Sequence, residues 1–203
     1  MNTEVIALAS YVLITTFTPG PNNITSASMG IIYGYTKSLR YLFGISFGFW
    51  LVMLFSGWIS YTILGILPSF ERLLRVVGAG YILWLAFHTM RASYTFQENQ
   101  AAFWGFSKGF LLQLLNPKVI IYGLALYSTF LVGTATKPVT LFVSSLVFAG
   151  VGFCAISTWT LFGAAIRAYL DRPVVKNLLN IILSLMLVFT AIELSGILNI
   201  LSR

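Results

Sequence analysis

The stretch Thr18-Pro19-Gly20-Pro21-Asn22-Asn23 interrupts an apolar run that is otherwise typical of a membrane-spanning helix. The stretch Asn116-Pro117-Lys118 interrupts a second apolar run in the same way. Pro21 and Pro117 lie 96 residues apart in a chain of 203, which is close to half its length. Within a bilayer, irregular backbone is tolerated only where protein covers it or where it lines a wet cavity. Paired interruptions in the two halves of a chain therefore indicate a transporter's binding site.

The composition predicts an all-α integral membrane protein, with residues 1–203 forming a single transmembrane domain. The chain is 58% hydrophobic and 8% charged, with a mean hydropathy of +0.89, whereas a soluble domain has about 25% charged residues. A spanning helix takes about 20 residues, so six spans leave no room for a soluble catalytic domain. We expect no catalytic residues. The net charge of +7 reflects basic residues at helix ends and does not indicate a nucleic-acid partner.

Cofactor and metal chemistry are poorly supported by the residues available for them. Cys154 is the single cysteine and His88 is the single histidine. This excludes an internal disulfide, a CxxC redox pair and a cysteine metal cluster. We therefore expect no metal and no cofactor, and we interpret His88 as an interfacial side chain near the end of a span.

Hydropathy and the positions of glycine, proline and charge predict six transmembrane helices, of which the first and fourth are broken. The N-terminus lacks the basic segment of a signal peptide, so we expect the first apolar run to be retained as a span. The predicted spans are residues 4–32, 41–67, 76–90, 106–131, 139–166 and 178–200.

The charges of the loops orient these spans, because lysine and arginine in short loops stay cytoplasmic. Seven basic residues fall in the first, third and fifth loops and four in the others, which predicts that both termini are periplasmic. Three spans per half is an odd number. We therefore expect two inverted three-helix repeats, repeat one at about 1–95 and repeat two at about 100–203. The alternative is that two unrelated proline kinks fall at a similar spacing.

The two breaks present backbone groups suited to a zwitterion. Proline lacks an N–H and suits the first position of a helix, and Gly20 permits the turn between Pro19 and Pro21. Asn116 is a good N-cap before Pro117. The new helix starts offer N–H donors to a carboxylate, and the preceding helix ends offer carbonyls to an ammonium. We therefore predict that the residues of both breaks bind substrate, namely Thr18, Pro19, Gly20, Pro21, Asn22, Asn23, Asn116, Pro117 and Lys118.

Lys118 is the most informative single residue, because a lysine deep in a span is costly and indicates function. We predict that it binds a substrate carboxylate or loses its proton during transport; the alternative is that it snorkels to an interface. Glu193 is the only acid well inside a predicted span. It is a candidate for coupling as a proton carrier or ammonium partner, or else a solvated or salt-bridged side chain. Tyr122 and Tyr127 are aromatic candidates for contact with an ammonium.

Small residues recur at spacings that bring membrane helices close together. The pairs are Gly30 with Gly34, Gly44 with Gly48 and Gly105 with Gly109, and Gly78-Ala79-Gly80 forms a further cluster. We interpret these positions as sites of helix packing and draw no conclusion about dimerisation from them.

Taken in order, the break at 18–23, the Gly44–Gly48 pair, Gly78-Ala79-Gly80-Tyr81 and Asn116-Pro117-Lys118 resemble the LysE/RhtB family of bacterial amino-acid exporters. The resemblance covers the whole chain, and the Thr-Pro-Gly-Pro-Asn motif in a first span is its most specific part. The residues around the first break and the run Ile120-Ile121-Tyr122-Gly123 look closest to the cysteine/O-acetylserine exporter branch. Members often carry an acidic residue where this chain has Phe49 and Trp50, which argues against a mechanism that needs a carboxylate in the second span.

The resemblance implies an exporter of small neutral amino acids in the bacterial inner membrane, driven by protons and often oligomeric. The expected partners are a small amino-acid substrate and the lipid bilayer, and a homodimer is left open. Alternative substrates within the family are threonine, homoserine, leucine and lysine. From the residues alone, a passive channel, a structural subunit of a larger complex and a membrane-embedded redox protein remain as alternatives of other classes.

Overall fold

The computed structural model describes residues 2–62, 76, 79–80, 82–84, 86–87, 90–91, 105–131, 137–169 and 172–195. These residues form helices without strands, as the composition predicts. The helices are α1 (Asn2–Phe17), α2 (Pro21–Thr62), α4 (Phe106–Leu114), α5 (Pro117–Thr129), α6 (Pro138–Ile166), the 3-10 turn η2 (Arg167–Tyr169) and α7 (Pro173–Ser195). The described residues at 76 and between 79 and 90 are also helical.

Both predicted breaks are confirmed, and each begins a new helix at a proline. α1 ends at Phe17 and α2 begins at Pro21. α4 ends at Leu114, α5 begins at Pro117, and the two helix axes are bent by 59°. Proline is well suited to these positions because its missing N–H would have no partner in the first helical turn.

The described residues contain three helical stretches long and apolar enough to cross a membrane, Pro21–Ser60, Pro138–Tyr169 and Pro173–Ile192, of which the first is kinked at Gly34, and a fourth if α4 and α5 form one bent span. Large apolar side chains cover the outside of these helices, among them Phe43, Phe55, Phe142 and Leu146, each about half exposed or more. An apolar outer surface of this kind is suited to lipid. The fold is therefore that of an all-helical, multi-span membrane protein.

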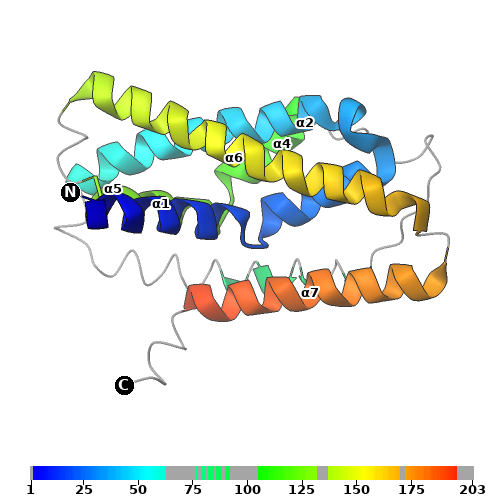
Figure 1. The fold of residues 1–203 in the computed structure, drawn as a ribbon. Coiled ribbons are helices and arrows are strands. Elements are labelled where there is room, and N and C mark those ends of the chain that lie inside the picture. Colours follow the sequence, from blue (N-terminus) through cyan, green and yellow to red (C-terminus); the bar gives the residue numbers. More distant parts are fainter. Residues whose placement is uncertain are drawn as a thin grey trace.

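α2 folds back on itself at Gly34, where the sequence predicts a loop at about 33–41. Gly34 has φ of 75°, a conformation that favours glycine, and the neighbouring residues stay helical. Along a straight helix, Thr25 and Tyr41 would lie about 24 Å apart. Instead the Tyr41 hydroxyl donates to Thr25 Oγ1 at 2.8 Å. The two arms of α2 therefore lie side by side, as Figure 1 shows. The prediction that Gly34 packs against another helix is wrong, because nothing lies near its missing side chain.

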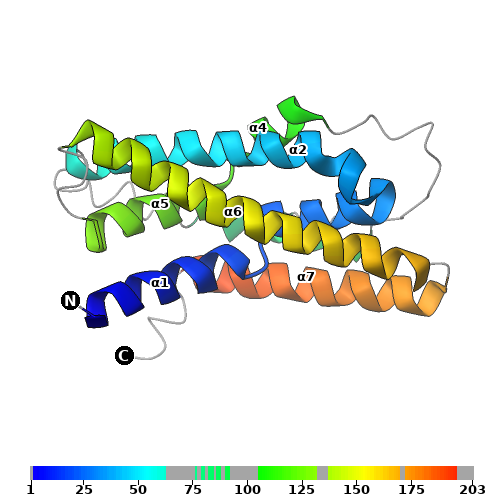
Figure 2. The same cartoon turned by 45° about the horizontal axis from the view of Figure 1, so that its top comes forward.

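α2 is the centre of the structure and packs against α4, α5 and α6 (Figures 1 and 2). Glycines provide the closest approaches. A Cβ on Gly44 would meet the Phe106 carbonyl of α4, and a Cβ on Gly109 would meet the Tyr41 carbonyl of α2. Gly30 lies in the same way against the Thr160 carbonyl of α6. The prediction of close helix packing is therefore confirmed at Gly30, Gly44 and Gly109.

Gly44→Val is expected to destabilise the protein by about 1–3 kcal/mol, because the added atoms overpack a contact with backbone that has no room to relax. The measurement is the thermal unfolding midpoint in detergent. Gly150→Val is the matched control, since nothing lies within 4 Å of a Cβ at Gly150 in α6. Equal midpoints for the two variants would contradict the assignment of Gly44 to a close helix contact.

Candidate functional site

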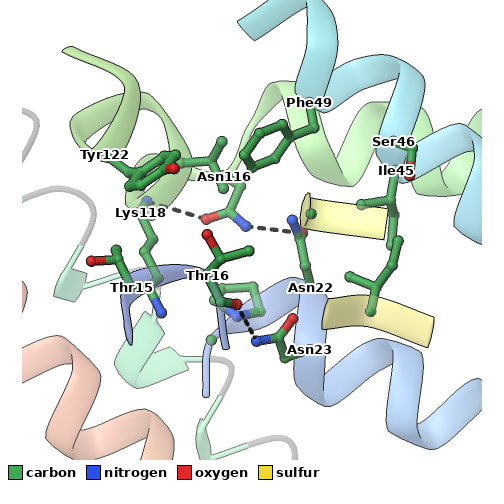
Figure 3. Close-up of a pocket in the computed structure, with 15 residues that line it drawn as sticks. Thr15, Thr16, Asn22, Asn23, Ile45, Ser46, Phe49, Asn116, Lys118 and Tyr122 are labelled. Atoms are coloured by element: carbon green, nitrogen blue, oxygen red, sulfur yellow. Dashed lines mark hydrogen bonds between the residues drawn. The ribbon is translucent and has the colours of Figure 1, made fainter. Parts of the chain in front are cut away.

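The two breaks meet inside the protein and are joined by side-chain amides. Asn116 Nδ2 donates to Asn22 Oδ1 at 2.9 Å, and Asn22 Nδ2 donates to Gln113 Oε1. Asn116 Oδ1 also accepts from the Lys118 backbone N–H at 3.1 Å, which confirms Asn116 as the N-cap of α5. Asn22, Gln113 and Asn116 are buried. Residues that lie more than 90 positions apart in sequence therefore form one buried amide network. Figure 3 shows the contact between Asn116 and Asn22.

The first break is organised by Asn23, which reaches back to the end of α1. Asn23 Nδ2 donates to the carbonyl oxygens of Thr16 and Thr18 at 2.9 and 3.0 Å. The last carbonyls of a helix have no partner within the helix, so Asn23 satisfies groups that the break would leave open. The backbone N–H groups of Asn22 and Asn23 lie in the first turn of α2, where helix geometry provides no intrahelical acceptor.

Lys118 extends from the first turn of α5 to the opposite break. Its ammonium donates to the carbonyl oxygens of Thr18 and Pro19 at 3.0 and 3.3 Å. In this conformation the charge is bonded to backbone of the opposite break. These contacts differ from the expectation that the carbonyls at the end of α1 are open to a substrate's ammonium. In this conformation Lys118 occupies them.

Two further helices hold the same break in place. In α7, buried Thr190 donates its hydroxyl to the Pro19 carbonyl at 2.6 Å and to the Met186 carbonyl at 2.9 Å. In α6, Trp159 Nε1 donates to the Phe17 carbonyl at 3.2 Å. The chain between α1 and α2 is therefore fixed by side chains from α2, α5, α6 and α7.

Thr190→Val is expected to lower the free energy of unfolding by about 1–3 kcal/mol, because valine keeps the shape but leaves a buried hydrogen bond to Pro19 unmade. Thr158→Val is the matched control, since exposed Thr158 bonds only the carbonyl of Cys154 in its own helix. Thermal unfolding of both variants in detergent measures the difference. Indistinguishable midpoints would show that α7 is not held to the break through this hydroxyl.

A cavity of about 40 Å³ lies where the breaks meet, room for about three water molecules. Of the nine predicted binding residues, the six that line it are Gly20, Pro21, Asn22, Asn23, Asn116 and Lys118. Thr18 and Pro19 are not among its lining residues but supply the carbonyls that bind Lys118. Pro117 is buried at the start of α5 and lies outside the lining.

Several lining residues lie outside the predicted set: Thr15, Thr16, Ile45, Ser46, Phe49, Val119, Tyr122, Gly152 and Ile156. Tyr122, one of the two aromatic candidates, is among them, because it lies four residues after Lys118 and shares its face of α5. Ile45, Ser46 and Phe49 belong to the second arm of α2, which reaches the cavity only because of the reversal at Gly34. Tyr127, an aromatic candidate, lies away from the cavity, with its hydroxyl 3.0 Å from Ser144 Oγ and its ring against Phe148.

The cavity is polar in part and carries a cationic side chain. Among the described residues that line it, Lys118 is the one charged residue and none is acidic. Ser46 Oγ lines the cavity and Gln113 Nε2 lies in the adjoining amide network, and neither has a hydrogen-bond partner in the described structure. The Tyr122 hydroxyl is also buried and has no hydrogen-bond partner in the described structure. A buried polar group without a partner calls for an explanation, and a bound polar ligand provides one.

The remaining chemical candidates lie partly outside the described structure. Glu193 is in the last turn of α7, three residues beyond Thr190, and its side chain is not among those described. His88 also lies outside the described residues. Within the described ranges, no group of three or more His, Cys, Asp or Glu residues is placed to hold a metal ion.

Comparison with known proteins gives a match that covers nearly the whole chain. Residues 13–196 match the family model of the LysE type translocator. The "Cysteine/O-acetylserine efflux protein" of Salmonella typhimurium is 36% identical over 192 residues, covering 93% of this chain and 95% of the relative. The protein of the same name from Klebsiella pneumoniae is 35% identical over 196 residues, covering 95% and 97%. The Escherichia coli protein of that name is 36% identical over 188 residues, covering 93% and 95%. No solved structure matches the chain.

Proposed function

The chain belongs to the family of LysE-type translocators, and from that premise we propose that it exports cysteine and O-acetylserine across the bacterial inner membrane. The efflux proteins that resemble it over their whole length support this substrate class. The observation that carries the proposal is the Lys118 ammonium, which joins the two breaks beside a cavity. Threonine, homoserine, leucine and lysine remain the alternative substrates.

The backbone and side chains around the cavity suit the two charged groups of an amino acid. The backbone N–H groups of Asn22 and Asn23 in the first turn of α2 have no intrahelical acceptor, and the partial positive charge at the starts of α2 and α5 favours a carboxylate. Lys118 adds a full positive charge on the same side. The carbonyls at the end of α1 favour an ammonium. The polar atoms of Ser46 and Tyr122 are then available to the substrate's side chain.

The energy source in this proposal is the proton gradient. Lys118 is the first candidate for the coupling group because it lines the cavity. Glu193 is the second, because it follows Thr190 by nearly one turn of α7 and Thr190 bonds the same Pro19 carbonyl as Lys118. Gain or loss of a proton at Lys118 or Glu193 would change which backbone carbonyls and N–H groups can bind the substrate.

The topology in this proposal is six spans in one domain, residues 1–203, with inverted repeats at about 1–95 and 100–203 and with both termini in the periplasm. Support comes from the similar construction of the two breaks, in each of which two or three residues separate the end of one helix from a helix that begins at proline. In addition, glycines on both arms of α2 form close contacts with a neighbouring helix, Gly30 with α6 and Gly44 with α4. Labelling of cysteines introduced near each terminus with an impermeant reagent tests the orientation.

Counterflow in proteoliposomes tests the transport activity. Vesicles loaded with unlabelled cysteine or O-acetylserine should accumulate the labelled compound, and this uptake should saturate. Vesicles loaded with leucine or lysine should show little exchange. Uptake that rises linearly with concentration would indicate a passive channel, and absence of exchange with either compound would contradict the proposed substrates.

A further inference from the structure

We propose that the carbonyl oxygens of Thr18 and Pro19 form a seat for a single ammonium group, which Lys118 occupies until the substrate's ammonium replaces it. In that exchange the Lys118 ammonium moves to the substrate's carboxylate. The inference rests on the proposed function, because it assigns the two charges of that function's substrate to atoms of the same site. We call the two carbonyl oxygens the ammonium seat.

The ammonium seat exists because the chain is not helical between α1 and α2. Thr18 and Pro19 are the residues between the end of α1 and Gly20, so their carbonyls are free to point away from a helix axis. Both oxygens lie within 3.3 Å of the same nitrogen, Lys118 Nζ. Two carbonyls that converge on one ammonium in a low-dielectric interior form a strong site for a cation.

The bonding capacity of the seat allows one cation. A carbonyl oxygen has two lone pairs. Asn23 Nδ2 donates to one lone pair of the Thr18 carbonyl oxygen at 3.0 Å, and the Thr190 hydroxyl donates to one lone pair of the Pro19 carbonyl oxygen at 2.6 Å. Each oxygen is left with a single lone pair, and both of these serve Lys118. A second ammonium therefore cannot bind beside Lys118 and must replace it.

Displacement of Lys118 selects for a substrate that carries its own carboxylate. A buried ammonium needs a new partner when it loses the old one, and none of the described residues that line the cavity is acidic. A zwitterion supplies that partner as it binds, whereas a simple amine does not. The four-carbon stem of lysine allows the movement, and Gly20 makes room for it, because a Cβ there would lie 2.9 Å from Lys118 Cδ and 3.2 Å from Nζ.

Binding of three related thiols to the purified wild type and to Lys118→Met tests the exchange. The probes are cysteine, cysteamine, which lacks the carboxylate, and 3-mercaptopropionate, which lacks the ammonium. Isothermal titration under reducing conditions should show wild type binding cysteine about tenfold or more tightly than cysteamine. Lys118→Met should bind cysteamine about tenfold more tightly than wild type does, because its seat is vacant. The Lys118→Met protein should no longer bind cysteine more tightly than cysteamine.

Gly20→Ala provides an independent variant that keeps the lysine. Its added methyl group crowds the Lys118 stem, so it should also tighten cysteamine binding, whereas Gly150→Ala, in open surroundings, should not. The thermal unfolding midpoint first shows that each variant is folded. The proposal is overturned if neither Lys118→Met nor Gly20→Ala then binds cysteamine more tightly than wild type. If both variants gain cysteamine binding while wild type fails to bind cysteine, the seat is supported and the proposed substrate is contradicted.

Discussion

Lys118→Met is expected to reduce cysteine counterflow about 10- to 100-fold. A hydrogen bond to a charged group contributes about 1.5–3 kcal/mol, and each 1.4 kcal/mol corresponds to about a tenfold change in binding. Methionine keeps the apolar stem but removes the ammonium that bonds the Thr18 and Pro19 carbonyls. The measurement is the initial rate of labelled cysteine uptake into preloaded proteoliposomes, normalised to the amount of protein inserted.

Lys137→Met is the matched control for this variant, because Lys137 is exposed before α6 and makes no side-chain cap. It should transport at close to the wild-type rate. Lys118→Arg should recover little of the loss, since a planar guanidinium differs in shape and donor geometry from an ammonium. A wild-type rate of uptake by the Lys118→Met protein would contradict the assignment of Lys118 to the binding site.

Asn22→Leu is expected to destabilise the protein by about 2–5 kcal/mol, which is a large share of an ordinary domain's stability. Leucine has a similar shape, but it leaves the Gln113 carbonyl oxygen and the Asn116 amide nitrogen without the partner that each has in the buried network. Each unmade buried hydrogen bond costs about 1–3 kcal/mol. Thermal unfolding in detergent measures the effect, with exposed Asn177→Leu in α7 as the control.

A double variant separates loss of the network from loss of packing. Replacing both partners of a buried hydrogen bond with apolar groups costs less than replacing one. Asn22→Leu combined with Gln113→Leu should therefore be more stable than the sum of the two single effects predicts, and the cycle measures that coupling. Strict additivity would show that the amides of Asn22 and Gln113 do not act as a pair.

The positions of the two breaks could be predicted from the sequence because proline acts locally. Pro21 and Pro117 each remove an N–H and fix a backbone angle, so the helix starts follow from single residues. Asn116 as N-cap follows from the same local chemistry. Apolar composition and length gave the helical membrane fold in the same direct way.

The contacts between the breaks could not be predicted in this way, because they depend on how distant segments pack. Gln113 and Thr190 look like ordinary polar residues in apolar helices, yet Gln113 bonds Asn22 and Thr190 bonds Pro19 across 91 and 171 positions. Ser46 reaches the cavity because α2 reverses at Gly34. Glycine pairs indicate close packing without identifying the partner helix, so the sequence predicts packing at Gly34, where the structure has a turn.

Lys118 illustrates the difference between identifying a residue and assigning its partner. The cost of a charge inside a span predicts a functional role for Lys118 without any structure. Its partner depends on which groups the folded chain brings within reach, and these are the carbonyls of the opposite break. The sequence therefore predicts the seat and the lysine separately, and the structure shows that the lysine occupies the seat.

The most direct test of the central claim, that the cavity between the two breaks binds the exported amino acid, is protection of Ser46 from chemical labelling. Ser46→Cys in a Cys154→Ser background places one thiol in the cavity, where Ser46 Oγ is buried and has no described partner. The measured quantity is the rate of its modification by N-ethylmaleimide with and without O-acetylserine. We predict that O-acetylserine slows this rate severalfold and leaves labelling of exposed Cys154 in the wild type unchanged. An unchanged rate at position 46 in a variant that still transports O-acetylserine would contradict the account.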